Sequence, residues 1–165
     1  MVYHSMWYDG APHQGQCEGC TFNLWQIKDA VYLNARGVSF AVLTAGRWDE
    51  VARYVEFMGY TQRWYSVRDV ESSLLTEEGH LISYLRDGDR VFETYWTTGR
   101  GCEVMGNSYG MLDMTVYGRQ EPWEDSPEGW PRRGRDGGFR SNGRPISQWS
   151  RLAAGRSDDL GTAGR

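Results

Sequence analysis

A change of composition near residue 118 limits how much of this chain can fold around one core. Residues 118–165 hold 4 of the 5 prolines and 9 of the 21 glycines, with few β-branched side chains and no sustained hydrophobic period. Segments of this kind bury too little apolar surface to offset the entropy lost when a chain is ordered. The sequence therefore predicts one folded domain over residues 1–117. It predicts a flexible, largely irregular Gly/Arg/Pro-rich tail over residues 118–165.

The two parts also differ in charge. Residues 1–117 carry 9 basic and 15 acidic side chains, a net charge of −6, whereas the tail carries 9 arginines and 7 acids, a net charge of +2. A nucleic-acid surface needs clustered basic residues, so the acidic folded part argues against nucleic acid as a partner. Arg135, Arg140 and Arg144 stand in the glycine-rich tail, where a solvated terminus is a simpler interpretation than weak contact with RNA.

Two absences bear on location. No apolar run reaches the roughly 18 residues of a membrane span, which argues against a membrane partner. The N-terminus shows no basic region followed by an apolar stretch, so no secretory signal is recognised. The expected location is the cytoplasm. The sequence does not indicate an oligomeric state.

The hydrophobic pattern predicts an α/β domain. Strands are expected at residues 2–8, 38–43 and 64–67, the second of them buried on both faces, and a hairpin joins strands 81–85 and 91–96. Helices are expected from the cysteine pair to about residue 37, over residues 48–59 and over residues 101–114. A parallel strand–helix–strand unit, then an antiparallel hairpin and a helix, is the layout of a thioredoxin-like fold. Its central mixed sheet has flanking helices.

The sharpest chemical feature is the pair Cys17 and Cys20, placed after the first strand and at the start of the first helix. Free N–H groups and the dipole at a helix N-terminus stabilise a thiolate and lower the pKa of the first cysteine. A spacing of two residues places the second sulfur one turn further on, within reach of a disulfide. In a chain of this type the pattern favours a redox dithiol. Cys102 is expected to be a lone buried cysteine.

Other interpretations of the cysteines stay open. They could bind copper or zinc together with His4 or His13, although no second pair of Cys or His ligands follows in the sequence. They could also be inert in a non-catalytic remnant domain. In the redox interpretation, a charged His13, four residues before Cys17, would lower the pKa of that thiol, and His4 on the first strand is the other candidate.

Two features oppose a general disulfide-exchange role. Glu18 puts a negative charge beside Cys17, which disfavours the thiolate. The chain has no proline between Pro12 and Pro122, whereas thioredoxin-type oxidoreductases place a cis-proline opposite the dithiol.

Several motifs, in one order, resemble an uncharacterised bacterial thioredoxin-like family, domain of unknown function 899. They are VYHSM at 2–6, GQCEGCTF at 15–22, LNARGVSFAV at 33–42, MGY at 58–60, RDGD at 86–89, VFETY at 91–95 and LDMTVYGRQ at 112–120. The resemblance covers about residues 2–133. Beyond Arg133 the tail does not resemble the ending of the family, and relatives have an N-terminal extension, so the domain is expected to be N-terminally short.

The resemblance implies a thioredoxin-like fold and places Cys17, Cys20 and His4 on the positions of a family dithiol. It supplies no established activity. The favoured hypothesis is a thioredoxin-like dithiol redox protein, a thiol–disulfide oxidoreductase without a cofactor. Cys17 would attack, Cys20 would resolve, and His13 or His4 would adjust the pKa. Its partner would be a thiol, disulfide or small-molecule substrate that the sequence does not identify.

Overall fold

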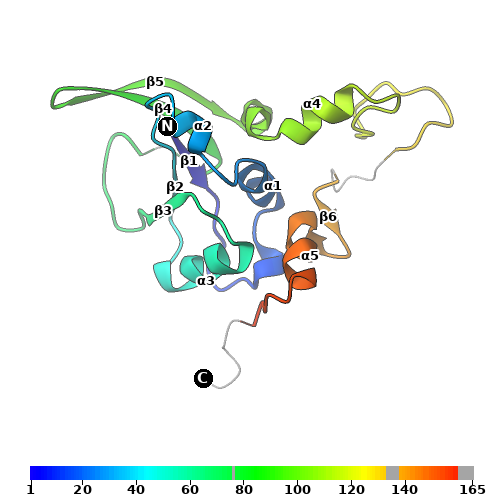
Figure 1. The fold of residues 1–165 in the computed structure, drawn as a ribbon, viewed down its shortest axis with the longest axis horizontal. Coiled ribbons are helices and arrows are strands. Elements are labelled where there is room, and N and C mark those ends of the chain that lie inside the picture. The colour runs from blue at the N-terminus through cyan, green and yellow to red at the C-terminus, as the bar shows by residue number, and fades with distance from the viewer. Residues whose placement is uncertain (76, 133–137, 160–165) are drawn as a thin grey trace.

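The computed structural model of the chain describes residues 1–75, 77–132 and 138–159. A mixed sheet of five strands lies at its centre, in the order β3-β2-β1-β4-β5 (Figure 1). The strands are β1 (Val2–Ser5), β2 (Ala41–Thr44), β3 (Arg63–Ser66), β4 (His80–Asp87) and β5 (Arg90–Thr98).

The strand directions confirm the mixed sheet expected from the sequence. Strand β1 runs parallel to β2, and β2 runs parallel to β3. Strand β4 is antiparallel to both β1 and β5, and the predicted turn at Gly88 joins β4 to β5. The order and directions of β5, β4, β1 and β2 are compatible with a thioredoxin-like sheet. Strand β3 adds one parallel strand at the edge.

Helices follow the strands in the expected sequence. Up to residue 117, the α-helices are α1 (Glu18–Gln26), α2 (Val31–Asn34), α3 (Trp48–Met58) and α4 (Asn107–Asp113). Two 3₁₀ segments are η1 (His13–Gly15) and η2 (Gly99–Met105). Helix α3 matches the prediction closely. Gly59 ends it with a positive φ of 65°, a conformation that glycine adopts without a steric cost.

The first predicted helix is two helices. Helix α1 ends at Gln26, and the short α2 begins at Val31. Two side chains explain the break. The Gln62 amide donates to the carbonyls of Leu24 (3.0 Å) and Ile27 (2.5 Å), which the end of a helix leaves without partners. The Asp29 carboxylate then accepts the N–H of Val31, the first residue of α2, at 2.9 Å in a local turn before that helix.

Strand β2 begins three residues later than predicted. Its burial alternates, with Val42 and Thr44 buried and Ala41 and Leu43 half-buried, so the expectation of burial on both faces is wrong. The last predicted helix, over 101–114, is also divided at Gly106 into η2 and α4. A Cβ at Gly106 would overlap the Phe22 ring of α1, so the division lies where the backbone approaches that ring closely.

The core lies on one face of the sheet. Cross-strand partners share a face, so the pairings of Tyr3 with Val42 and Leu81, and of Val42 with Trp64, put these four side chains together. They join one buried cluster with Leu24 and Cys20 from α1 and with Val51, Tyr54, Phe57 and Met58 from α3. Helices α1 and α3 therefore cover this face, and the cysteine pair stands at its border.

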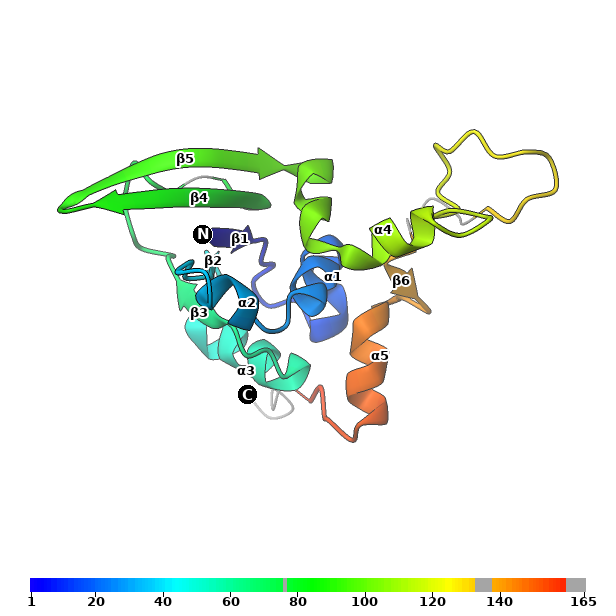
Figure 2. The same ribbon diagram turned by 45° about the horizontal axis from the view of Figure 1, so that its top comes forward.

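The far part of the β4–β5 hairpin extends away from the helices (Figure 2). Its large apolar side chains are exposed; they are Leu85, Val91, Phe92, Tyr95 and Trp96.

The tail is mostly irregular where it is described, with one ordered exception. Strands β6 (Arg140–Ser141) and β7 (Arg144–Pro145) form a small hairpin, and α5 (Ile146–Ala153) follows it directly. The hairpin and α5 contact α1, and α5 also contacts α3 (Figure 1). No helix in the described ranges is long and apolar enough to cross a membrane.

Candidate functional site

Cys17 occupies the N-cap of α1. Its sulfur accepts the backbone N–H of Cys20 at 3.4 Å, in the place that a serine or aspartate oxygen takes at many helix starts. The Cys17 thiol is half-buried and lies 3.8 Å from the Met6 sulfur. The sequence prediction that the pair begins a helix after β1 is therefore confirmed, and Cys17 is the more accessible of the two thiols.

Cys20 is buried one turn into α1, and a tyrosine reaches it. The Tyr3 hydroxyl donates to the Cys20 sulfur at 3.3 Å, and the Asn23 amide lies 3.5 Å from the same hydroxyl. Neither Tyr3 nor Asn23 was expected at the site. Strand alternation indicates that Tyr3 and His4 point to opposite faces of β1, but not which of these faces α1 covers.

The two thiols differ in acidity. The hydrogen bond with the Cys20 thiol, helped by the N–H of Cys20, lowers the pKa of Cys17 to about 7, although burial and Glu18 oppose this. The same thiol–thiol hydrogen bond, together with burial, raises the pKa of Cys20 well above its usual range, and only the Tyr3 hydroxyl and a backbone bond act against that rise. The pair therefore has one easily formed thiolate and one thiol that keeps its proton.

The structure does not bring the predicted histidines to the sulfurs in the expected way. The His13 ring stacks on Phe57 at 5.0 Å and lies 5.3 Å from Tyr54, so it packs against α3. Burial lowers the pKa of His13, which favours the neutral ring over the charged one expected from the sequence. His4 is buried on β1 and, by alternation, faces away from the side on which Tyr3 contacts Cys20.

The loop that leads into α1 is held by buried amides. The Gln16 side chain accepts the N–H of Tyr8 (3.1 Å) and donates to the carbonyls of Tyr8 (2.9 Å) and Ala11 (3.3 Å). Gln148 of α5 donates to the His13 carbonyl at 2.8 Å and to the Tyr54 hydroxyl at 3.2 Å. The backbone just before Cys17 is thus fixed from two sides.

Arginines from the tail complete this support. Arg140 binds Glu18 at 3.0 Å, and Arg144 donates to the Gln14 side chain (2.6 Å) and to Gln148 (3.0 Å). The expectation of a solvated terminus is therefore wrong for Arg140 and Arg144, because both guanidiniums find acceptors around the loop. Arg135 lies outside the described residues.

The other cysteine and the metal alternative can be placed as well. Cys102 is buried in η2, near the carbonyls of Gly79 (3.4 Å) and Thr97 (3.6 Å), as expected for a lone buried thiol. Within residues 1–75, 77–132 and 138–159, no group of three or more His, Cys, Asp or Glu side chains could hold a metal ion. In the described part of the chain, the copper or zinc alternative therefore finds no His, Asp, Glu or further Cys that completes a group of three with Cys17 and Cys20.

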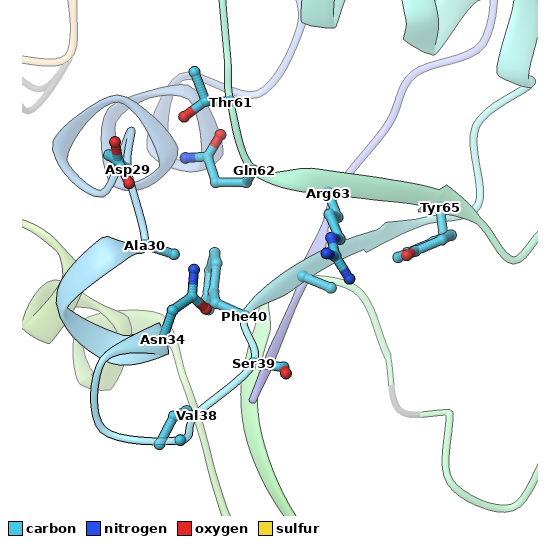
Figure 3. A pocket seen from close by; sticks show the side chains of 12 residues that line it. Asp29, Ala30, Asn34, Val38, Ser39, Phe40, Thr61, Gln62, Arg63 and Tyr65 are labelled. Atoms are coloured by element: carbon cyan, nitrogen blue, oxygen red, sulfur yellow. The ribbon is translucent and has the colours of Figure 1, made fainter.

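The cavities that lie outside the dithiol include two with different linings. One, of about 560 Å³, is lined by polar groups that include Asn34, Gln62 and Arg63, with Phe40 as an apolar wall (Figure 3). It lies where β2 and β3 begin, whereas Cys17 follows the end of the parallel strand β1. This cavity and the dithiol are therefore at opposite ends of the parallel strands. The other, of about 260 Å³, runs along α1 from Glu18 past Phe22 and Trp25.

Comparison with known proteins gives a family match. A family model described as a bacterial protein of unknown function (DUF899) matches residues 1–151. The match extends past Arg133, where the motif resemblance was expected to end, and it includes β6, β7 and most of α5. Among curated proteins and solved structures, none matches the chain.

Proposed function

Because the chain belongs to this bacterial family (DUF899), whose model spans both the dithiol and the segment that supports it, we propose that it is a thioredoxin-like dithiol redox protein. Cys17 and Cys20 would act on a thiol, disulfide or small-molecule substrate in the cytoplasm. The observation that carries this proposal is the asymmetry of the pair. The half-buried Cys17 forms a thiolate near neutral pH, and the buried Cys20 lies one turn away.

The proposed reaction balances in two steps. The Cys17 thiolate attacks a substrate disulfide, forms a mixed disulfide and releases one substrate sulfur, which takes up a proton. Cys20 then loses its proton, attacks the Cys17 sulfur and releases the second substrate thiol. The substrate gains two electrons and the protein keeps a Cys17–Cys20 disulfide. Two molecules of a small thiol such as glutathione, which cytoplasm supplies, would return the pair to two thiols and would themselves be oxidised to one disulfide.

Tyr3 would assist the second step. Its hydroxyl donates to the Cys20 sulfur, and a hydrogen bond of this kind stabilises the charged form of the group that accepts it. The buried Cys20 would therefore be able to carry a transient negative charge while it attacks.

Redox titration tests the proposal directly. The purified protein is equilibrated in glutathione buffers of increasing oxidation, and its thiols are then trapped and located by mass spectrometry. We expect Cys17 and Cys20 to change together between two thiols and one disulfide, with Cys102 unchanged. In Cys20→Ser, Cys17 should instead stop at a mixed disulfide with glutathione. Two thiols that never form a reversible disulfide would refute the proposal.

The pH dependence gives a second test. We expect the rate at which iodoacetamide alkylates Cys17 to rise with pH around a midpoint near 7, because only the thiolate reacts. An unperturbed cysteine has its midpoint at about 8.5. A midpoint at that value in the native protein, with an unfolded sample as reference, would show that the fold does not activate Cys17.

A further inference from the structure

The guanidinium of Arg140, in the tail, forms hydrogen bonds with the stretch of chain around Cys17. It donates to the Glu18 carboxylate (3.0 Å), to the carbonyls of Gln14 (2.6 Å) and Gln16 (2.9 Å), and to the Gly143 carbonyl (3.1 Å). Three of these four acceptors belong to the short stretch that contains Cys17. A guanidinium suits this arrangement because its donors point in fixed directions within one plane.

Packing of the β6–β7 hairpin brings Arg140 to this place. Its turn uses Asn142 and Gly143, both with positive φ (51° and 74°), as a tight two-residue hairpin requires. Phe139, just before β6, packs on Phe22 of α1 at a ring distance of 5.1 Å and on Tyr109 of α4 at 5.9 Å. The guanidinium is therefore held from the hairpin side as well as by its acceptors.

Glu18 links this contact to the chemistry of Cys17. Its carboxylate follows Cys17 directly in the sequence, and its negative charge raises the pKa of the Cys17 thiol. Arg140 holds the same carboxylate in an ion pair, with side chains that are 24% and 40% exposed. The titratable groups that act on or near Cys17 are Cys20 and Glu18 from α1, Tyr8 from the loop after β1, and Tyr54 from α3.

We propose that Arg140 is a positioning residue of the dithiol site, and that it acts on Cys17 by neutralising the Glu18 carboxylate that its guanidinium holds. The role rests on the proposed function, since it assumes that Cys17 is the reacting thiol. In this role Arg140 weakens the opposition of Glu18 to a thiolate that the hydrogen bonds with Cys20 favour. It also gives the C-terminal segment, which the sequence marked as tail, a part in the reactivity of a residue more than a hundred positions earlier.

The test measures how fast iodoacetamide alkylates Cys17 as a function of pH. In Arg140→Gln, we expect Cys17 to react about two- to fivefold more slowly near pH 7, because an unpaired Glu18 disfavours the thiolate by an amount typical of a half-exposed ion pair. In Glu18→Gln the midpoint should move to lower pH. This variant keeps the carbonyl contacts of Arg140, so it is expected to fold normally.

The double variant decides the mechanism. If Arg140 acts through Glu18, then Arg140→Gln combined with Glu18→Gln should react close to the wild-type rate. A double variant as slow as Arg140→Gln alone, or an Arg140→Gln protein with the wild-type midpoint, would overturn the proposal. The matched control is Arg90→Gln, which removes an exposed arginine paired with Asp87 at the hairpin tip and should leave the Cys17 rate unchanged. Alkylation does not require a reversible disulfide, so this test and the redox titration can fail separately.

Discussion

At the scale of single residues, the Tyr3 hydroxyl ties the central strand to the buried sulfur. It donates to Cys20 from the face of β1 that packs under α1, and the Asn23 amide lies against it. Because Cys20 is buried and its pKa is raised, this hydroxyl is the side-chain donor that favours the Cys20 thiolate. The fold places it there through the simple alternation of a strand.

This contact predicts the behaviour of Tyr3→Phe. The ring keeps its packing, but the Cys20 thiolate loses a donor. We expect Cys20 to resolve a mixed disulfide on Cys17 about five- to tenfold more slowly, which corresponds to a hydrogen bond worth about 1–1.4 kcal/mol. The rate can be followed with an aromatic disulfide that first labels Cys17 and then releases a coloured thiol as Cys20 attacks.

Tyr60→Phe is the matched control for Tyr3→Phe. It also removes a buried hydroxyl hydrogen bond, made to the Thr21 carbonyl at 3.3 Å, but not one to sulfur. The control should lose a similar amount of stability and resolve at the wild-type rate. Equal resolution rates in both variants would mean that the Tyr3 hydroxyl has no effect on Cys20.

At this scale the sequence predicted the cysteines but not their partners. A Cys-x-x-Cys pair after a strand is recognisable because the strand, the cysteine pair and the start of the helix follow one another in one short stretch of sequence. The choice between Tyr3 and His4 depends on which face α1 covers, and local order does not contain that information. The rings of Tyr54 and Phe57 come from a distant part of the chain, so the sequence around His13 does not predict that they pack against it. Burial among these rings favours the neutral imidazole over the charged one.

At the scale of elements, the break between η2 and α4 lies where the backbone passes close to the Phe22 ring of α1. Gly106 lies against the Phe22 ring of α1. Because glycine has no Cβ, the backbone that follows β5 can approach α1 closely. Phe22 in turn contacts Tyr109 of α4 at a ring distance of 4.8 Å. The chain turns at Gly106, and both η2 and α4 contact the helix that carries the dithiol.

We expect Gly106→Ala to lower the free energy of unfolding by about 1–3 kcal/mol, because the new methyl group forces the Phe22 ring or the backbone to move. The control is Gly110→Ala, in α4 itself, where a Cβ has open space. That change should be neutral or should stabilise the helix by up to about 1 kcal/mol. Chemical denaturation of both variants measures the difference, and a Gly106→Ala protein as stable as Gly110→Ala would contradict the packing argument.

Elements whose cause is local could be predicted well. Helix α3 and the β4–β5 hairpin have their end signals, Gly59 and Gly88, within the segment itself. The ends of α1 and η2 could not be predicted in this way. Gln62, which ends α1, comes from another part of the chain, so no local pattern indicates that break. Gly106 is a local signal that weakens the last predicted helix. The Phe22 ring that lies against it comes from α1, so the sequence around Gly106 does not fix the break there.

At the scale of the whole molecule, the C-terminal segment of residues 139–153 returns to the loop before Cys17. Gln148 of α5 is completely buried there, and it joins His13, Tyr54 and Arg144 in one hydrogen-bonded group. A glycine- and arginine-rich composition suggests a solvated tail when only the apolar area that the segment can bury is considered. In this tail, the Arg140 guanidinium and the Gln148 amide bind backbone carbonyls of the loop, and Arg144 binds the side chain of Gln14. A hydrophobic pattern does not show these polar contacts.

Gln148→Leu tests how much this group contributes. Leucine has a similar size but leaves the His13 carbonyl and the Arg144 guanidinium without one partner each, so we expect a loss of about 1–3 kcal/mol in the free energy of unfolding. Ser150→Ala, on the exposed part of the same helix, should change stability by about 0.5 kcal/mol or less. Faster amide hydrogen exchange in the loop of residues 13–17 should accompany the loss in Gln148→Leu alone. Unchanged exchange there would show that α5 does not hold the loop.

The return of the tail also gives the molecule a property of tethered systems. Residues 139–153 bind the loop before Cys17 as a ligand binds its receptor, and the backbone between the two segments acts as the linker. While the chain is intact, the effective concentration of this ligand is set by the linker and not by the amount of protein. A single cut between α4 and β6 would make the contact bimolecular, and the arrangement around Cys17 would then weaken on dilution.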